Sequence, residues 1–145
     1  MIPRGPHAGQ PVLRAGVPVG EATKAVIAIH GRGGSASDSI EIGKAIGLPD
    51  VAWLAPEAAS HTWYPYSFLS PIAQNEPYLS SALQTVAEVV QQVSEAGIAN
   101  EKIIIGGFSQ GACLASEFVA RNGQRLGGLL VFSGGLIGPP GTQRN

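Results

Sequence analysis

Cysteine and charge are both scarce in this sequence of 145 residues. The single cysteine, Cys113, excludes a disulfide within the chain and favours a cytoplasmic location. Charged residues make up 13% of the chain and leave a net charge of -1, which argues against nucleic acid or acidic membranes as partners. No apolar run is long enough to span a membrane, and residues 1–10 contain no apolar stretch typical of an export signal. A hydrophobic share of 44% predicts a well-packed globular domain.

Apolar runs alternate with amphipathic stretches along the chain, which predicts an α/β fold. We expect buried strands over residues 25–29, 51–55, 103–106 and 129–132, and a first edge strand over residues 12–17. Helices are expected over residues 35–47, 77–97 and 112–122, with apolar residues at three- and four-residue steps. Strands that alternate with helices favour a mostly parallel sheet with helices on both faces.

The start of the chain is rich in proline and glycine. We expect residues 1–11 to form a flexible tail on a single domain that spans residues 1–145. His7 lies in this stretch and is expected to be solvated.

A long irregular stretch, residues 57–76, separates the strand over 51–55 from the next helix. Such loops in compact domains are usually functional. Its aromatic residues include Trp63, Tyr64 and Phe68, with Tyr66 between them. Two interpretations are open: these rings form a substrate pocket, or they anchor the loop to the domain.

The pattern G-x-S-x-G occurs where residues 103–106 give way to the helix over 112–122, as Gly107, Ser109 and Gly111. In this strand–turn–helix context the turn is sharp and strained, and it lifts the serine hydroxyl off the end of the sheet. Only glycines at the two flanking positions leave room for neighbouring backbone. Ser109 is therefore a candidate nucleophile, and the alternative is a solvated serine in an ordinary glycine-rich loop.

A serine hydroxyl is a poor nucleophile unless a base removes its proton and hydrogen-bond donors hold the resulting oxyanion. The N–H of Gln110 lies at the start of the predicted helix, where amides are unpaired and the helix dipole favours an anion. A second donor is expected from the loop His30-Gly31-Arg32-Gly33-Gly34, which follows the strand over 25–29. Its glycines let backbone amides approach a ligand closely.

Together these two loops resemble the phospholipase/carboxylesterase family of α/β-hydrolases, which includes the acyl-protein thioesterases. Residues 55–58, followed by Thr62, Trp63 and Tyr64, are similar to the substrate-side loop of that family. The resemblance implies that the N–H groups of Arg32 and Gln110 form the oxyanion hole. It also implies hydrolysis of small carboxylic esters or thioesters through an acyl-serine intermediate, without a metal or a cofactor.

The acid and the base of a catalytic triad are missing from the expected places. This fold places them after the serine, in the order acid then histidine. Beyond Ser109 the sequence has no histidine and a single acid, Glu117, which we expect to be a surface charge. Among the earlier histidines, His30 is expected to shape its loop through a hydrogen bond, and His61 to be exposed. We therefore expect the triad Asp and His beyond residue 145, with the C-terminal strands of the hydrolase fold.

Two functional hypotheses follow. The first is a serine carboxylesterase, and the alternative is a short form of the fold that binds an acyl ligand or a partner without turnover. In both cases the strand over 129–132 reads as buried but has no later strand to pair with. We expect a C-terminal fragment or a second copy to cover the edge formed by Leu129, Leu130, Val131 and Phe132.

Cys113 is expected to be a packing residue, and the Arg32 side chain either attracts an acidic substrate or is solvated.

Overall fold

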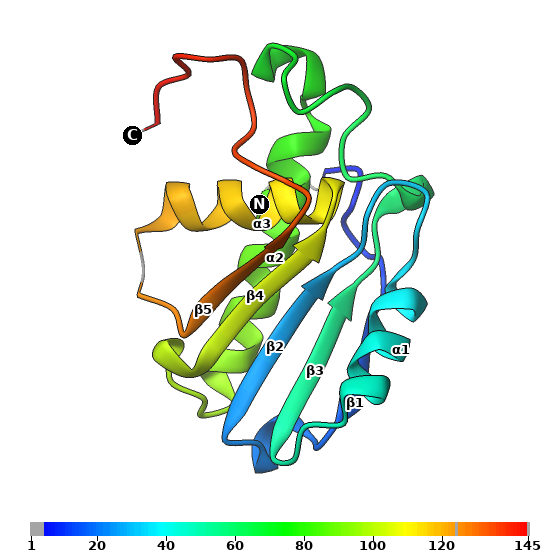
Figure 1. The fold of residues 1–145 in the computed structure, drawn as a ribbon, viewed down its shortest axis with the longest axis vertical. Helices are drawn as coiled ribbons and strands as arrows, with labels where there is room; N and C mark the ends of the chain where they lie inside the picture. Colours follow the sequence, from blue (N-terminus) through cyan, green and yellow to red (C-terminus); the bar gives the residue numbers. More distant parts are fainter. Residues whose placement is uncertain (1–4, 124, 145) are drawn as a thin grey trace.

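A five-stranded sheet forms the centre of the computed structural model, which describes residues 5–123 and 125–144 (Figure 1). Its strands are β1 (Val12–Gly16), β2 (Lys24–Ile29), β3 (Val51–Pro56), β4 (Ile103–Phe108) and β5 (Gly128–Phe132). The strand order is β1-β3-β2-β4-β5, and β1 alone runs antiparallel to its neighbour. The predicted strands and the mostly parallel sheet are confirmed.

Three α-helices cover the two faces of the sheet (Figure 1). Helix α1 (Ala36–Ile46) packs on one face, against β1 and β3, while α2 (Tyr78–Glu95) and α3 (Gln110–Asn122) lie on the other. Ser35 begins α1 with the predicted capping box, and Gly47 ends it in the left-handed conformation. The predicted α/β-hydrolase-like layering is therefore confirmed.

The main core lies between the sheet and the pair α2 and α3. Alternate residues of β2 enter it, because successive side chains of a strand point to opposite faces. Ala25, Ile27 and Ile29 are all fully buried there. The apolar stripe of α2 packs opposite them, through Leu79, Ala82, Val86, Val89, Val90 and Val93. This core fixes the carboxyl ends of β2 and β4 side by side, with Ile29 in register with Gly107.

The start of the chain is packed onto the domain rather than extended from it. His7 is buried: its N–H donates to Ser81 Oγ (2.9 Å), and its ring bonds the backbone at Ala59 and Trp63. The expectation of a solvated His7 is therefore wrong, because these contacts tie it to the core, while the flexible tail over residues 1–11 stays a prediction. Residues 1–4 lie outside the described part of the chain.

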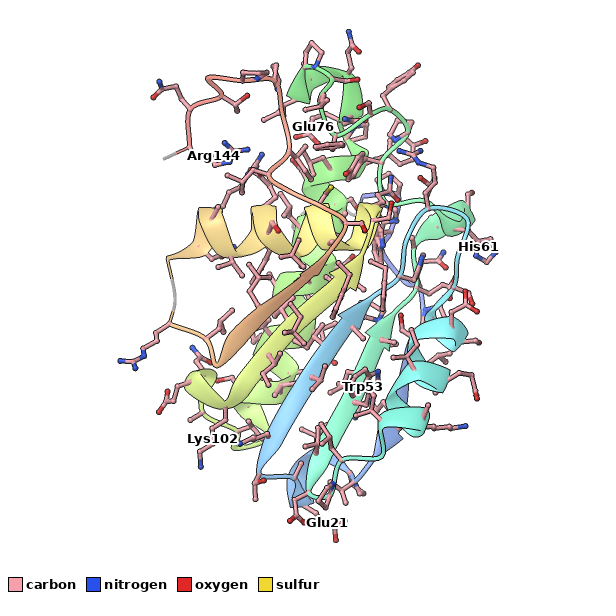
Figure 2. The ribbon with its side chains drawn as sticks, viewed as in Figure 1. Glu21, Trp53, His61, Glu76, Lys102 and Arg144 are labelled. Carbon is pink, nitrogen blue, oxygen red and sulfur yellow. The ribbon has the colours of Figure 1, made fainter. Side chains whose placement is uncertain are left out.

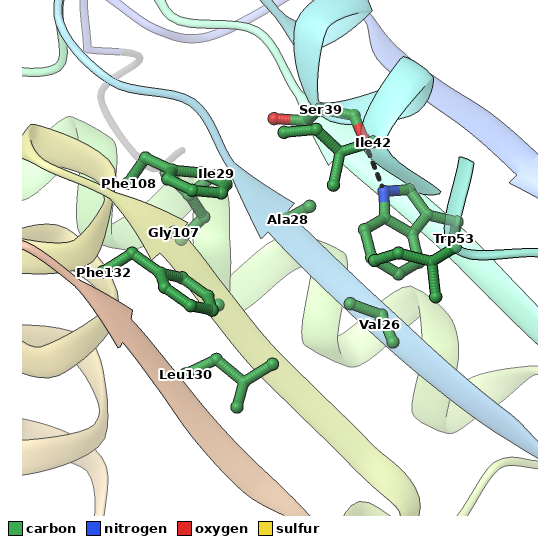
Figure 3. A pocket seen from close by; sticks show the side chains of 12 residues that line it. Val26, Ala28, Ile29, Ser39, Ile42, Trp53, Gly107, Phe108, Leu130 and Phe132 are labelled. Carbon is green, nitrogen blue, oxygen red and sulfur yellow. Dashed lines mark hydrogen bonds between the residues drawn. The ribbon is translucent and has the colours of Figure 1, made fainter. Parts of the chain in front are cut away.

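The face of the sheet beside α1 remains partly open within the described residues. Apolar side chains from β2, β4 and β5 line a cavity of about 190 Å³ there, next to Trp53 and Ile42 (Figure 3). Phe108 and Phe132 stack at its rim, with ring centroids 4.9 Å apart. The expectation that β5 is buried is wrong for this chain, since Leu130 and Phe132 are each 47% exposed.

Candidate active site

Ser109 occupies the turn between β4 and α3. Its backbone has φ 50° and ψ -113°, a conformation that is uncommon for residues other than glycine. The Ser109 N–H donates to the Phe132 carbonyl (2.8 Å), and its own carbonyl accepts from the Cys113 N–H (3.0 Å). The side chain is exposed and does not cap α3. The backbone of the turn is thus held on both sides, while its hydroxyl faces solvent.

The two flanking glycines lie where backbone segments meet. An ideal Cβ on Gly107 would come within 2.4 Å of the Gly111 carbonyl carbon. One on Gly111 would come within 2.2 Å of the Ile29 carbonyl oxygen. Both positions therefore require glycine for the reason that the sequence pattern gives, which is close approach of neighbouring backbone.

The loop after β2 lies directly against this turn. A Cβ on Gly31 would lie 3.1 Å from the Phe108 carbonyl oxygen and 3.7 Å from Ser109 Cβ. Beyond it the loop turns back: the Gly34 N–H donates to Gly31 and the Gly33 N–H to the His61 carbonyl (2.7 Å). The two loops predicted to face each other are therefore brought together at the carboxyl ends of β2 and β4 (Figure 1).

The amides of Arg32 and Gln110 are the predicted oxyanion donors. Among the described residues, neither N–H donates to a backbone or side-chain acceptor. Gln110 is the first residue of α3, where the helix geometry offers its N–H no partner and the dipole favours negative charge. These two N–H groups could therefore donate to an anion held at Ser109 without first losing another hydrogen bond.

His30 is buried and both of its ring nitrogens are engaged. The Ala58 N–H donates to Nε2 (3.1 Å), so the ring proton lies on Nδ1, which is 2.8 Å from the Gly31 carbonyl oxygen. His30 thus shapes its own loop, as expected, and holds no ring nitrogen toward Ser109.

The other two histidines contact backbone groups as well. His7 accepts from the Ala59 N–H through Nδ1 (3.0 Å), and its Nε2 lies 2.7 Å from the Trp63 carbonyl oxygen. His61 is exposed, as expected, and its Nδ1 lies near Glu57 and the Gly34 carbonyl (Figure 2). Both ring nitrogens of His7 are therefore engaged, whereas the His61 contacts within the described residues involve Nδ1 alone.

Two of the three predicted pocket residues belong to the core. Trp63 and Tyr64 are fully buried, and Trp63 lies between the His7 and His30 rings, with centroids 5.2 and 5.1 Å away. Burial raises the pKa of Tyr64 above its ordinary value, and the adjacent Cys113 thiol adds to this. These two rings anchor the loop instead of forming an open pocket, which corrects the pocket interpretation for both. Phe68, at 36% exposed, remains a candidate for substrate contact.

The side chains of Arg32 and Gln110 hold this aromatic loop. Arg32 is exposed, as the solvated alternative expects, and its guanidinium donates to the carbonyls of Pro65 and Tyr66, each at 2.9 Å. The Gln110 side chain bonds the backbone of Trp63 and Tyr64. The sequence offers no signal for these contacts, because they join segments about 30 to 50 residues apart.

Glu117 is not a surface charge. Its side chain is fully buried and forms ion pairs with Arg121 (2.6 Å) and Arg144 (2.7 Å), while it accepts the Ile137 N–H (2.9 Å). Burial by itself would raise the pKa of Glu117, but the hydrogen bonds from Arg144, Arg121 and Ile137 lower it below its ordinary value. Arg144 reaches α3 from the C-terminal segment (Figure 2). Glu117 therefore ties this segment to α3, the helix that follows Ser109.

The described residues also bear on membrane and metal binding. No helix among them is both long and apolar enough to cross a membrane. No group of three or more His, Cys, Asp or Glu side chains in the described ranges is arranged to hold a metal ion. Cys113 is buried in the core, consistent with a packing role.

Solved structures and characterised sequences resemble this chain. A phospholipase/carboxylesterase from Dyadobacter fermentans is 48% identical and superposes with a TM-score of 0.86, over 90% of this chain and 62% of that one. Acyl-protein thioesterase 1 of Cryptococcus neoformans is 26% identical over 77% of this chain and 54% of its own length. Acyl-protein thioesterase 1 homolog 1 of Dictyostelium discoideum is 30% identical, with 77% of this chain and 57% of that protein covered.

The chain thus spans between half and two-thirds of the length of these relatives. The family profile described as phospholipase/carboxylesterase matches residues 16–145. This range includes the Ser109 turn, the loop after β2 and all of the sheet except residues 12–15 of β1. Together with the shared architecture, this match shows that the chain belongs to the phospholipase/carboxylesterase family of α/β-hydrolases.

Proposed function

We propose that this chain carries the nucleophile and the oxyanion hole of a serine carboxylesterase. The observation that carries the proposal is the exposed Ser109 hydroxyl on a positive-φ turn, beside the unengaged amides of Arg32 and Gln110. Backbone strain of this kind persists where the surrounding structure imposes it, and it clusters at active sites. Here β4, α3 and the Ile29 carbonyl all constrain the turn.

In the proposed reaction, the Ser109 hydroxyl and the two N–H groups each have one role. Ser109 Oγ attacks the carbonyl carbon of the ester while a base takes the hydroxyl proton. The carbonyl oxygen becomes an oxyanion, which accepts hydrogen bonds from the N–H groups of Arg32 and Gln110. The alcohol or thiol then leaves with a proton, and water releases the acid from the acyl-serine intermediate. None of these steps assigns a role to a metal or a cofactor.

The acid and the base of the triad come, in this proposal, from polypeptide beyond residue 145. The ring nitrogens of His7 and His30 are committed to backbone groups, which supports a base from elsewhere. The greater length of the relatives supports the same conclusion. By itself the 145-residue chain is then expected to be inactive.

The substrates proposed are small carboxylic esters or thioesters, with Phe68 as a candidate contact. Relatives named as acyl-protein thioesterases and as a carboxylesterase support this class. We also propose a cytoplasmic protein, which the single, buried cysteine supports.

The exposed edge of β5 suggests that further polypeptide packs against it. Leu129, Leu130, Val131 and Phe132 are all at least 36% exposed in this chain. An unpaired apolar edge favours association. We propose that the C-terminal part of the protein covers this edge, either as continuing chain or as a separate fragment, and that a second copy does so where that part is missing.

The test uses the protein extended beyond residue 145, with p-nitrophenyl acetate as substrate. Ser109→Ala is expected to lower hydrolysis by about a thousandfold or more. The control is Ser94→Ala, which changes an exposed serine of α2 and should leave the rate unchanged. Equal rates for Ser109→Ala and the parent would exclude Ser109 as the nucleophile.

A second candidate function is a short form that binds an acyl ligand or a partner without turnover. It is favoured by His7 and His30, whose ring nitrogens are all engaged with backbone groups. A fluorophosphonate probe separates the two candidates, since it labels an activated serine. If the 145-residue chain is not labelled but measurably binds a fatty acid, the short form is supported; labelling of that chain at Ser109 would count against it.

A further inference from the structure

The side chains of the two proposed oxyanion residues converge on one hydroxyl. Arg32 Nη1 donates to Thr62 Oγ1 at 3.1 Å, and Gln110 Nε2 donates to the same oxygen at 3.2 Å. Thr62 lies 30 residues from Arg32 and 48 from Gln110 along the chain. The hydroxyl therefore joins the loop after β2 to the first turn of α3 through a third segment.

The hydrogen bonding at this hydroxyl is saturated. A threonine hydroxyl has one proton to donate and two lone pairs to accept with. Thr62 Oγ1 has two acceptors within reach of its one proton, the Tyr64 carbonyl (3.0 Å) and Gln110 Oε1 (3.3 Å), and it accepts from Arg32 and Gln110. Thr62 is half-buried, so losing it leaves these donors with reduced access to water.

The same two side chains bind the next four residues of the loop, 63–66. The Gln110 amide accepts the Trp63 N–H (2.7 Å) and donates to the Tyr64 carbonyl (2.8 Å). The Arg32 guanidinium continues with the carbonyls of Pro65 and Tyr66, and lies 5.9 Å from the Tyr64 ring centroid. The loop and the two residues thus form one hydrogen-bonded unit.

We propose that Thr62 is a positioning residue, which sets the relative placement of the Arg32 and Gln110 amides. This inference rests on the proposed function, because it assigns Thr62 to the same oxyanion hole. Two donors stabilise an oxyanion only when both are aimed at its position, and errors of about 0.5 Å already matter. Glycines flank Arg32 on both sides, so its backbone has little intrinsic rigidity. The side-chain bond to Thr62 adds to the hydrogen bonds that Gly31, Gly33 and Gly34 make through their backbone.

The test compares Thr62→Val, which keeps the shape but removes the hydroxyl, with Thr62→Ser, which keeps the hydroxyl. In the protein extended beyond residue 145, Thr62→Val is expected to lower kcat for p-nitrophenyl acetate about 10- to 100-fold, less than the full loss of a donor, with KM nearly unchanged. Thr62→Ser should restore most of kcat. Thr85→Val is the control, since the Thr85 hydroxyl bonds only the Ser81 carbonyl in α2; it should keep the parent kcat.

A second measurement separates this inference from the proposed function. In the same protein the Trp63 amide, bonded to Gln110, should exchange its hydrogen about 3- to 10-fold faster in Thr62→Val than in the parent or in Thr62→Ser. If the parent shows no hydrolysis that depends on Ser109, the proposed function fails and exchange alone decides the role of Thr62. Parent kcat in Thr62→Val, equal losses in the Val and Ser variants, or unchanged exchange would each overturn the inference.

Discussion

The carbonyl oxygen of Ile29 lies 2.2 Å from the point where a Cβ on Gly111 would stand. The first turn of α3 therefore touches the carboxyl end of β2 through backbone alone. This contact places the serine turn beside the loop that holds Arg32, and it explains why the pattern around Ser109 ends in glycine.

Gly111→Ala is expected to destabilise the protein by about 2–4 kcal/mol, because the added methyl group forces backbone apart and no flexible side chain can yield. Gly107→Ala should act similarly, since its Cβ would meet the Gly111 carbonyl group. Denaturant unfolding measures both effects. Gly20→Ala is the matched control, with open space around the added methyl group and no positive φ; a Gly111→Ala protein as stable as this control would refute the steric account.

Glu117 predicts an acid-sensitive contact between α3 and the C-terminal segment. Glu117→Gln is expected to cost about 2–4 kcal/mol, because Arg121 and Arg144 lose the buried carboxylate that pairs with them. The pKa of Glu117 is lowered in the folded protein, so its contribution is complete above the ordinary pKa of 4.5 and is lost as the pH falls below that value.

Unfolding free energies from pH 7 to pH 3 test this contact. The parent should lose stability below about pH 4.5 more steeply than Glu117→Gln. Glu41→Gln serves as control, because Glu41 forms an exposed pair with Lys44 at 3.5 Å and should contribute about 0–1 kcal/mol. Identical acid slopes for the parent and Glu117→Gln would contradict the prediction.

The buried His7 predicts a second pH dependence of the unfolding free energy, at higher pH than that of Glu117. Burial lowers the pKa of His7 from 6.5, the Trp63 carbonyl opposes this, and His30 adds to the lowering. The neutral ring is therefore the form that stabilises the fold, and its contribution should decline as the pH falls below 6.5. His7→Ala is expected to cost about 2–3 kcal/mol at pH 8, since the Ala59 N–H and the Trp63 carbonyl lose their partner.

The measurement for His7 is the difference in unfolding free energy between the parent and His7→Ala at pH 8 and at pH 5.5. That difference should shrink at the lower pH. His61→Ala gives the comparison, because its ring is exposed and its removal should change stability little. A constant difference across this range would show that His7 does not titrate in the way described.

The open face of the sheet predicts self-association of the 145-residue chain. Leu130→Lys combined with Phe132→Lys should shift sedimentation toward monomer, because charge on an edge strand opposes pairing between sheets. Leu69→Lys alters an equally exposed leucine away from this face and should have no such effect. A parent chain that sediments as a monomer at micromolar concentration would contradict the prediction.

Local sequence predicts most of the fold. Continuous apolar runs place β2, β3 and β4, and period-3.6 apolar patterns place α1 and α2, within a few residues of their observed bounds, because these elements are defined by which faces they bury. The glycine spacing around Ser109 also predicts the strained turn, since close backbone contact depends on the missing Cβ atoms themselves. These features follow from neighbours in sequence.

Contacts between distant segments decide the rest. Glu117 reads as a surface charge on its helix, yet Arg144, 27 residues later, folds back to neutralise it. His7 reads as part of a tail until the Trp63 loop supplies two partners for its ring. The residue type and spacing at Ser109 were determined by the sequence alone, whereas the partners of Glu117, His7 and Thr62 were decided by the tertiary structure, because a buried polar group takes its role from whatever the fold brings within hydrogen-bond distance.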